Sequence, residues 1–105
     1  LFAITNFSGE FWRPFRAAQA AFFDRFRDVV VSGDEGLMKP GRAIYELALA
    51  RFGLRAGEAV FFDDNPANVA GAVTVGIEAR LFTGAAGCRA ALVEVGVLGI
   101  STETL

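Results

Sequence analysis

The sequence contains no histidine, and it has only one cysteine among its 105 residues. Without histidine the chain can form neither a Ser-His-Asp triad nor an HExxH zinc site, and it has no imidazole base. The single cysteine, Cys88, excludes a disulfide within the chain and a CxxC site. We interpret Cys88 as a packed or half-exposed thiol rather than a nucleophile, because no base lies near it in the sequence.

The chain also has little net charge and no long apolar run. The formal net charge of -2 gives no electrostatic reason to expect a nucleic-acid partner. No apolar run approaches the roughly 20 residues that a membrane helix needs, so no membrane partner is expected. The chain opens at Leu1 without a methionine and without the basic flank of a signal peptide. We therefore expect a cytoplasmic protein, and a fragment whose upstream part is missing.

The residues that are present suit one small α/β domain over residues 1–105. Hydrophobic residues make up 53% of the chain and include 11 phenylalanines, which is ample material for a core. Short apolar runs at residues 2–4, 28–31, 59–62 and 79–82 predict four strands. Helical patterns cover residues 10–26, 41–52, 66–75 and 86–95. This alternation predicts a Rossmann-like parallel sheet with flanking helices.

Local signals place the ends of the helices. Gly53 is a plausible C-terminal cap for the second helix. Asn65 is suited to cap the third helix, with Pro66 at its first position and Gly76 near its end. The first helix carries phenylalanines and an alanine at helical spacing, which we interpret as a core-facing stripe rather than a ligand box: Phe11, Phe15, Ala18, Phe22 and Phe26.

Polar clusters follow three of the predicted strands. They are Thr5-Asn6, Ser32-Gly33-Asp34 and Asp63-Asp64. Ligands of open parallel sheets bind beyond the carboxyl ends of the strands, so this convergence indicates a site. Thr-Asn after a strand is usually a turn, but the Thr5 hydroxyl and the Asn6 amide are also able to donate hydrogen bonds to a phosphoryl oxygen.

The adjacent carboxylates of Asp63 and Asp64 have two interpretations. One of them could cap the helix that starts at Pro66. Alternatively, the pair could bind Mg²⁺, which typically takes one or two carboxylates together with water and substrate phosphate. Since Asn65 is already able to cap the helix, the stretch by itself leaves both interpretations open.

Lys39 favours the metal and phosphate interpretation. It is the only lysine among the ten basic residues, and Pro40 follows it directly. A compact ammonium approaches a phosphoryl oxygen or a carboxylate as a point charge, which a planar guanidinium does not do. The alternative is an ordinary solvated loop lysine.

Taken together, these residues resemble the haloacid dehalogenase-like (HAD) hydrolase superfamily. Ile4-Thr5-Asn6 resembles the second motif of that family, a strand ending in Thr or Ser. Lys39-Pro40 with the following helix resembles the third motif, and the stretch from residue 60 to 69 resembles the fourth, acidic motif. The similarity runs from about residue 2 to residue 83.

The resemblance implies roles for these residues. Thr5 and Lys39 would hold the transferred group and stabilise its charge, and Asn6 would assist in binding the substrate. The acidic motif would bind Mg²⁺, with Asp64 at the metal-ligand position and Asp63 beside it. Asn68 replaces an acid common in the family, so it is not expected to be a direct ligand.

The first motif of the family, which supplies the nucleophilic aspartate, does not occur in this sequence, and neither does the helical cap that selects the substrate. The complete enzyme would be a Mg²⁺-dependent phosphatase that acts on a small phosphate ester through an aspartyl-phosphate, and the isolated chain would be inactive. The alternatives are a 2-haloacid dehalogenase-type hydrolase and a non-catalytic binding domain on the same fold.

The missing strand would be the central one, between the strands that end at Thr5 and Asp63. Its absence would leave a gap of roughly 9–10 Å with unpaired backbone on both sides. We therefore expect the isolated chain to be poorly stable, or to close the gap by rearrangement or with a partner. The partner would be the missing N-terminal segment, or another copy that associates through the unpaired strand edges.

Overall fold

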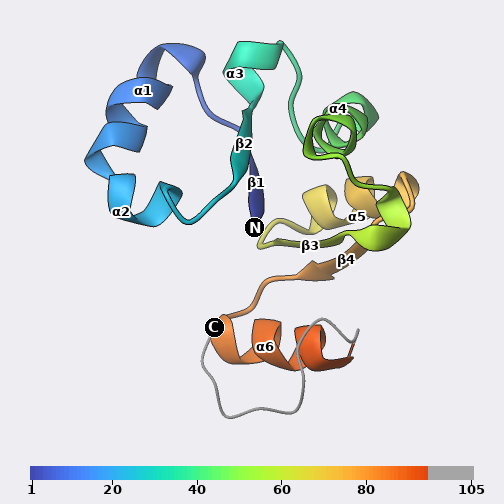
Figure 1. Cartoon of the computed structure of the whole chain (residues 1–105). Helices are drawn as coiled ribbons and strands as arrows, with labels where there is room; N and C mark the ends of the chain where they lie inside the picture. The colour runs from blue at the N-terminus through green and yellow to red at the C-terminus, as the bar shows by residue number, and fades with distance from the viewer. Residues whose placement is uncertain (95–105) are drawn as a thin grey trace.

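The computed structural model describes residues 1–94 and has an alternating α/β architecture (Figure 1). Its strands are β1 (Phe2–Thr5), β2 (Asp28–Val31), β3 (Val60–Asp63) and β4 (Glu78–Leu81). Its helices are α1 (Gly9–Ala18), α2 (Ala20–Phe23), α3 (Ser32–Glu35), α4 (Arg42–Phe52), the 3-10 turn η1 (Ala56–Glu58), α5 (Pro66–Thr74) and α6 (Ala85–Glu94). The predicted α/β class is confirmed. The last residue of the helix predicted over 86–95 and the tail after it lie outside the described residues.

The four strands form two separate parallel pairs. β1 pairs with β2 from Phe2↔Asp28 to Thr5↔Val31, and β3 pairs with β4 from Val60↔Glu78 to Asp63↔Leu81. Within residues 1–94, β1 and β3 share no ladder with one another. The interruption expected between these two strands is therefore present. The β3 and β4 boundaries differ from the predicted ones by one residue at each end.

Three of the predicted helix ends are present. α4 ends at Gly53, whose φ of 69° is a left-handed conformation that glycine adopts without strain. α5 begins after Asn65, whose side chain accepts a hydrogen bond from the Ala67 N–H at 2.9 Å, with Pro66 at the first helical position. Gly76, two residues after α5, has a φ of 90°.

The single helix predicted over residues 10–26 is wrong. The chain leaves helical geometry at Gln19 (φ -116°, ψ 32°), which separates α1 from α2. The predicted stripe is also partly wrong, since Phe11 is 60% exposed and Phe22 is 52% exposed. The break reorients the second helix, so that Trp12 and Phe23 are buried and their rings meet edge to face at 4.9 Å. The spacing of apolar residues along one continuous helix could not predict that Trp12 and Phe23 are the buried residues, because the helix breaks at Gln19.

The interior has two hydrophobic clusters. The central core joins β2, α4 and α5 through side chains from all three elements and from the loop before β4: Val30, Ile44, Tyr45, Ala48, Ala72 and Ile77. The aromatic cluster of Trp12, Phe23 and Val31 packs between α1, α2 and β2. Fully burying one large apolar side chain contributes about 1.5–3 kcal/mol, so the central core is the main source of cohesion.

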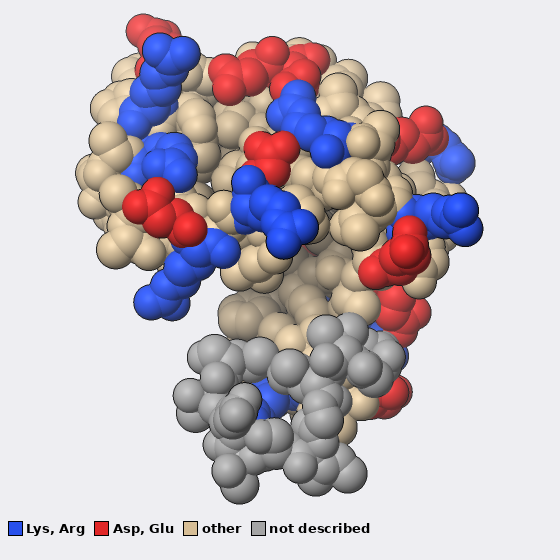
Figure 2. Space-filling view, viewed as in Figure 1, with Lys and Arg blue, Asp and Glu red and all other residues tan. Residues whose placement is uncertain are grey.

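On the face drawn in Figure 2, basic and acidic side chains are interspersed, and neither sign of charge forms a large patch. This agrees with the small net charge of -2. Among residues 1–94, no helix combines the length and the apolar character needed to cross a bilayer.

Candidate active site

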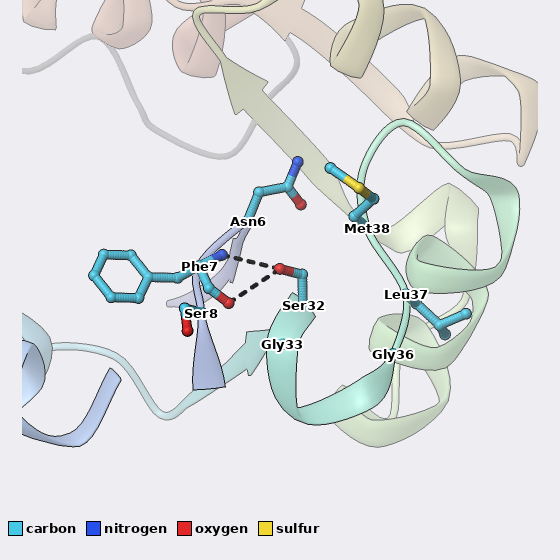
Figure 3. A pocket seen from close by; sticks show the side chains of 8 residues that line it. All are labelled: Asn6, Phe7, Ser8, Ser32, Gly33, Gly36, Leu37 and Met38. Carbon is cyan, nitrogen blue, oxygen red and sulfur yellow. Dashed lines mark hydrogen bonds between the residues drawn. The ribbon is translucent and has the colours of Figure 1, made fainter. Parts of the chain in front are cut away.

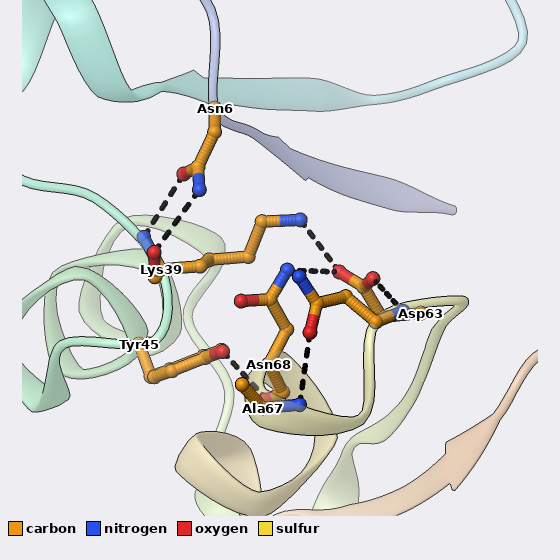
Figure 4. A network of polar contacts seen from close by, with 7 residues as sticks. Asn6, Lys39, Tyr45, Asp63, Ala67 and Asn68 are labelled. Atoms are coloured by element: carbon orange, nitrogen blue, oxygen red, sulfur yellow. Dashed lines mark hydrogen bonds and ion pairs between the residues drawn. The ribbon is translucent and has the colours of Figure 1, made fainter.

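Lys39 makes polar contacts with a residue that follows β1 and with a residue at the end of β3. It sits in the loop between α3 and α4, and its ammonium reaches the carboxylate at the end of β3 (Figure 4). The Lys39 Nζ donates to Asp63 Oδ2 at 2.7 Å. Both side chains are buried, with about a tenth of their surface exposed (10% and 8%). A buried ion pair of this kind requires both members, because either charge alone would be costly.

The Asp63 carboxylate is held by two further donors. The backbone N–H of Asn65 donates to Oδ1 at 2.9 Å, and the Asn68 amide donates to Oδ2 at 3.1 Å. Burial opposes ionisation of this carboxyl, but the hydrogen bonds from Lys39, Asn65 and Asn68 outweigh it, so the pKa of Asp63 lies below its ordinary value. Asp63 is therefore an anion whose oxygens are already engaged.

The amide of Asn6 is bound to the backbone of Lys39 through both of its polar atoms. Its Nδ2 donates to the Lys39 carbonyl at 3.0 Å, and its Oδ1 accepts from the Lys39 N–H at 2.9 Å. Through these two bonds, the residue that follows β1 positions the loop lysine that reaches β3 (Figure 4). Asn6 was predicted to bind substrate, and that role stays a prediction; in the structure its amide binds the backbone of Lys39.

The Lys39 loop is held from its other side by α5. A side-chain carbon placed on Gly71 would lie 2.6 Å from the Pro40 carbonyl oxygen and 3.1 Å from the Tyr45 ring. Only glycine allows the helix to approach the loop this closely. The Lys39 Nζ also lies 5.7 Å from the centroid of the Phe61 ring, which favours a cation over the ring face.

Tyr45 and Asn68 are site residues that the sequence reasoning missed or discounted. The Tyr45 hydroxyl donates to the Asn68 backbone carbonyl at 2.7 Å, in a fully buried position. Burial, with a smaller contribution from the Asp63 charge, raises the pKa of Tyr45 to about 12. The signal for Asn68 was its place in the first turn of α5, because that turn faces back toward the end of β3.

Asp64 is placed differently from its neighbour. It is exposed, and among residues 1–94 its carboxylate makes no hydrogen bond or ion pair. Its oxygens are thus available to a cation, whereas those of Asp63 are engaged. The described residues contain no cluster of three or more acids, cysteines or histidines arranged around one point. Asp64 therefore fits Mg²⁺ as one ligand of a set that these residues do not complete.

Thr5 is the last residue of β1 and is half-buried. In the described part of the chain its hydroxyl makes no side-chain hydrogen bond. Its backbone is fixed by pairing with β2 at Val31. Thr5 directly precedes Asn6, so it lies at the same strand end as the residue that binds the Lys39 backbone.

A pocket of about 440 Å³ lies beside this strand end (Figure 3). Its wall is formed by the segments that follow β1 and β2, including Asn6, Ser32 and Met38. Ser32 ties the two segments together, since its Oγ accepts from the Phe7 N–H at 2.9 Å and donates to the Phe7 carbonyl at 3.2 Å. A side-chain carbon on Gly33 would lie 2.1 Å from the Gly9 nitrogen, so this close approach also requires glycine.

Comparison with known proteins identifies the family of this chain. Residues 1–76 match the family model of the haloacid dehalogenase-like hydrolases. Because the match covers more than half of the chain, the protein belongs to the haloacid dehalogenase-like hydrolase family. No curated protein matches the sequence.

Solved structures give the same fold. A protein of uncharacterized function from Corynebacterium glutamicum is 27% identical, with a TM-score of 0.75, and the match covers 97% of this chain and 72% of that protein. A 2-haloacid dehalogenase from Pseudomonas syringae pv. Tomato DC3000 is 31% identical, with a TM-score of 0.61 and coverage of 75% and 32%. A dehalogenase solved as an intermediate complex is 25% identical, with a TM-score of 0.63 and coverage of 74% and 34%. The chain spans about a third of each of these two dehalogenases.

Proposed function

We propose that this chain forms part of a Mg²⁺-dependent phosphatase that acts on a small phosphorylated metabolite through an aspartyl-phosphate. The single observation that carries the proposal is the contrast between the two adjacent acids. Asp63 is neutralised by Lys39 at 2.7 Å, while Asp64 is exposed and its carboxylate makes no hydrogen bond or ion pair within residues 1–94. This arrangement leaves one free carboxylate beside a buried cation, which suits a metal next to a phosphoryl group. The proposed compartment is the cytoplasm.

In this proposal the residues of the chain bind and orient the group to be transferred. The Lys39 ammonium and the Thr5 hydroxyl donate to phosphoryl oxygens, and Asp63 and Asn6 keep the lysine directed toward them. Asp64 would hold Mg²⁺, which when bound supplies charge neutralisation for the phosphoryl oxygens. The nucleophilic aspartate would come from outside these 105 residues, so the isolated chain would be inactive.

A second candidate is a 2-haloacid dehalogenase-type hydrolase. It is favoured by the likeness to two solved dehalogenases, one of them 31% identical. Two adjacent acids would repel an attacking carboxylate and a departing halide, which argues against a dehalogenase. The ion pair with Lys39 removes most of that objection for Asp63, so Asp64 alone now argues against a dehalogenase. A binding domain without catalysis is the third candidate.

Calorimetric titration with MgCl₂ distinguishes these candidates. We expect weak binding at millimolar metal, because one carboxylate and water form an incomplete ligand set. The Asp64→Asn variant should lose this heat, and Glu10→Gln, which removes another exposed acid on α1, should retain it. Tryptophan fluorescence of Trp12 verifies that each sample is folded. A folded chain that binds no Mg²⁺, or whose binding survives Asp64→Asn, would contradict the metal site.

A further inference from the structure

The pocket of about 440 Å³ lies beside the residues that are proposed to hold the phosphoryl group (Figure 3). Its walls are the segment that follows β1 and the segment that leads from β2 to Lys39. In the first wall Asn6 directly follows Thr5, and in the second wall Met38 directly precedes Lys39. Because consecutive Cα atoms are about 3.8 Å apart, the pocket begins within one residue of each of these two groups.

The two walls are fixed by hydrogen bonds between them. Asn6 binds the Lys39 backbone through both polar atoms of its amide. Ser32 binds the Phe7 backbone through its hydroxyl, and the Gly33 N–H donates to the Phe7 carbonyl at 2.9 Å. The pocket is therefore formed before a ligand enters it, which limits the conformational entropy that binding would cost.

The lining of the pocket has few free polar groups. None of the described residues that line it carries a charge. The polar side-chain atoms of Asn6 and Ser32 are already bonded to backbone groups. Within residues 1–94 the Ser8 hydroxyl makes no side-chain hydrogen bond, so it is the one polar side chain of this lining that is free for a ligand. The remaining side chains other than glycine are apolar, namely Phe7, Leu37 and Met38.

Met38 is much more exposed than its neighbours in the sequence. It is 62% exposed, whereas Leu37 is half-buried and Lys39 is buried. Its side chain extends toward Asn6, which also lines the pocket (Figure 3). An unbranched thioether adapts to ligands of different shape, and its burial against an apolar group is favourable. Met38 is thus placed to cover an apolar group that lies beside the phosphoryl site.

From these observations we infer that the pocket binds the alcohol part of the substrate, that this part is short and largely apolar, and that Met38 is the residue that selects it. The inference rests on the proposed function, because it requires Thr5 and Lys39 to hold the phosphoryl group. Sugar and nucleoside phosphates are disfavoured, since their several hydroxyl groups would lose water and find only the Ser8 hydroxyl in exchange. Part of the substrate selection would then be made by this chain and not only by a cap.

Three phosphate esters test the pocket on the unmodified chain, with calorimetric titration in MgCl₂ as the measurement. Methyl phosphate tests the phosphoryl site alone. Propyl phosphate adds two methylenes, and glycerol 1-phosphate has the propyl skeleton with two added hydroxyl groups. Burial of one methylene favours binding about four-fold, so partial burial of two should make propyl phosphate bind about five-fold more tightly than methyl phosphate. Glycerol 1-phosphate should gain less than about two-fold, because its hydroxyl groups lose water in an apolar pocket.

Variants of Met38 identify the residue that selects the ester. Met38→Ser should reduce the ratio of the methyl to the propyl dissociation constant from about five to near one, and Met38→Leu should restore most of it. Val73→Ser removes another exposed apolar side chain, on the surface of α5, and should leave the ratio unchanged. A general loss of structure would weaken the binding of both esters together, so the ratio separates selection from stability.

Two results would overturn the inference and leave the proposed function standing. One is equal affinity for methyl and propyl phosphate in a chain whose Trp12 fluorescence shows it to be folded, and the other is a preference for propyl phosphate that survives Met38→Ser. A folded chain that binds none of the three esters would contradict the phosphoryl site of the proposed function and the inference with it. If Met38→Ser does not fold, the comparison of the three esters on the unmodified chain still decides whether the pocket takes an apolar group.

Discussion

The two strand pairs have the same length and the same parallel polarity, yet they are covered differently. The β3–β4 pair is packed by α5, which belongs to the central core with Ala72 completely buried (Figure 1). The β1–β2 pair is packed on one side by the aromatic cluster of α1 and α2, where Phe11 and Phe22 remain exposed. Val30 and Val31 of β2 are buried in the two clusters, whereas β3 and β4 contain no fully buried residue. Both halves keep apolar side chains exposed to solvent, such as Phe22 in the first and Val73 in the second.

The contacts that join the two strand pairs show which residues hold the fold together. No ladder connects β1 to β3 in the described residues, so they are held by the central core and by the polar contacts of Lys39. Its backbone is bound by Asn6 after β1, and its ammonium is bound by Asp63 on β3. Lys39 is therefore a structural link between the two pairs.

Replacing Lys39 with methionine should break this link and have the largest effect. The Asp63 carboxylate would remain buried without its cation, which typically costs about 3–5 kcal/mol. We expect the variant to be largely unfolded under conditions where the unmodified chain is folded, as measured by urea denaturation. Arg16→Met, which removes an exposed ion pair with Asp24, should cost less than about 1 kcal/mol. Similar losses in the two variants would contradict a structural role for Lys39.

Gly71→Ala should have an intermediate effect, because it acts on the approach of α5 to the Lys39 loop. The added carbon would lie 2.6 Å from the Pro40 oxygen, and overpacking of this kind costs about 1–3 kcal/mol. Gly57→Ala is the matched control, since a side-chain carbon there would have no neighbour within 4 Å. Denaturation midpoints compare the two. Equal midpoints would show that α5 does not press against the loop.

The smallest effect concerns the titration of Tyr45, the only tyrosine of the chain. Its pKa is raised to about 12 in the folded state, against about 10 for an unfolded tyrosine. Because the folded value is the higher one, this group stabilises the fold below pH 10, and the contribution is lost as the pH rises through about 12. Ultraviolet absorbance should show the high midpoint in buffer and the ordinary midpoint in urea. A midpoint near 10 in the folded chain would place Tyr45 outside the core.

Much of this molecule could be predicted from the sequence, where the determining interactions are local. The cap at Asn65, the glycine after α4 and the apolar runs of the strands depend on neighbouring residues, and their predictions are confirmed. The sequence indicated that the Lys39 ammonium suits a phosphoryl oxygen or a carboxylate, but it did not identify Asp63 as its partner. The break at Gln19 and the burial of Trp12 in place of Phe11 depend on how α2 packs against β2, which a periodic pattern does not contain.

In the candidate site, too, local features could be predicted from the sequence and long-range contacts could not. The resemblance of three short motifs indicated which residues carry charge and hydroxyl groups, but it did not indicate the contact of Asn6 with Lys39. Its two bonds to the Lys39 backbone, across 33 positions in sequence, require the folded geometry. The hydrogen bond from Tyr45 to the Asn68 carbonyl likewise joins two helices and leaves no local signal.

The most direct test of the central claim, that the Lys39–Asp63 pair links the two strand pairs, is a double-mutant cycle. The variants are Lys39→Met, Asp63→Asn and both together, with unfolding free energies measured in trimethylamine N-oxide to keep weak variants folded. We predict that the double variant is more stable than the sum of the single losses implies, by about 1.5–3 kcal/mol, because removing both charges leaves neither buried alone. Losses that simply add would contradict the claim.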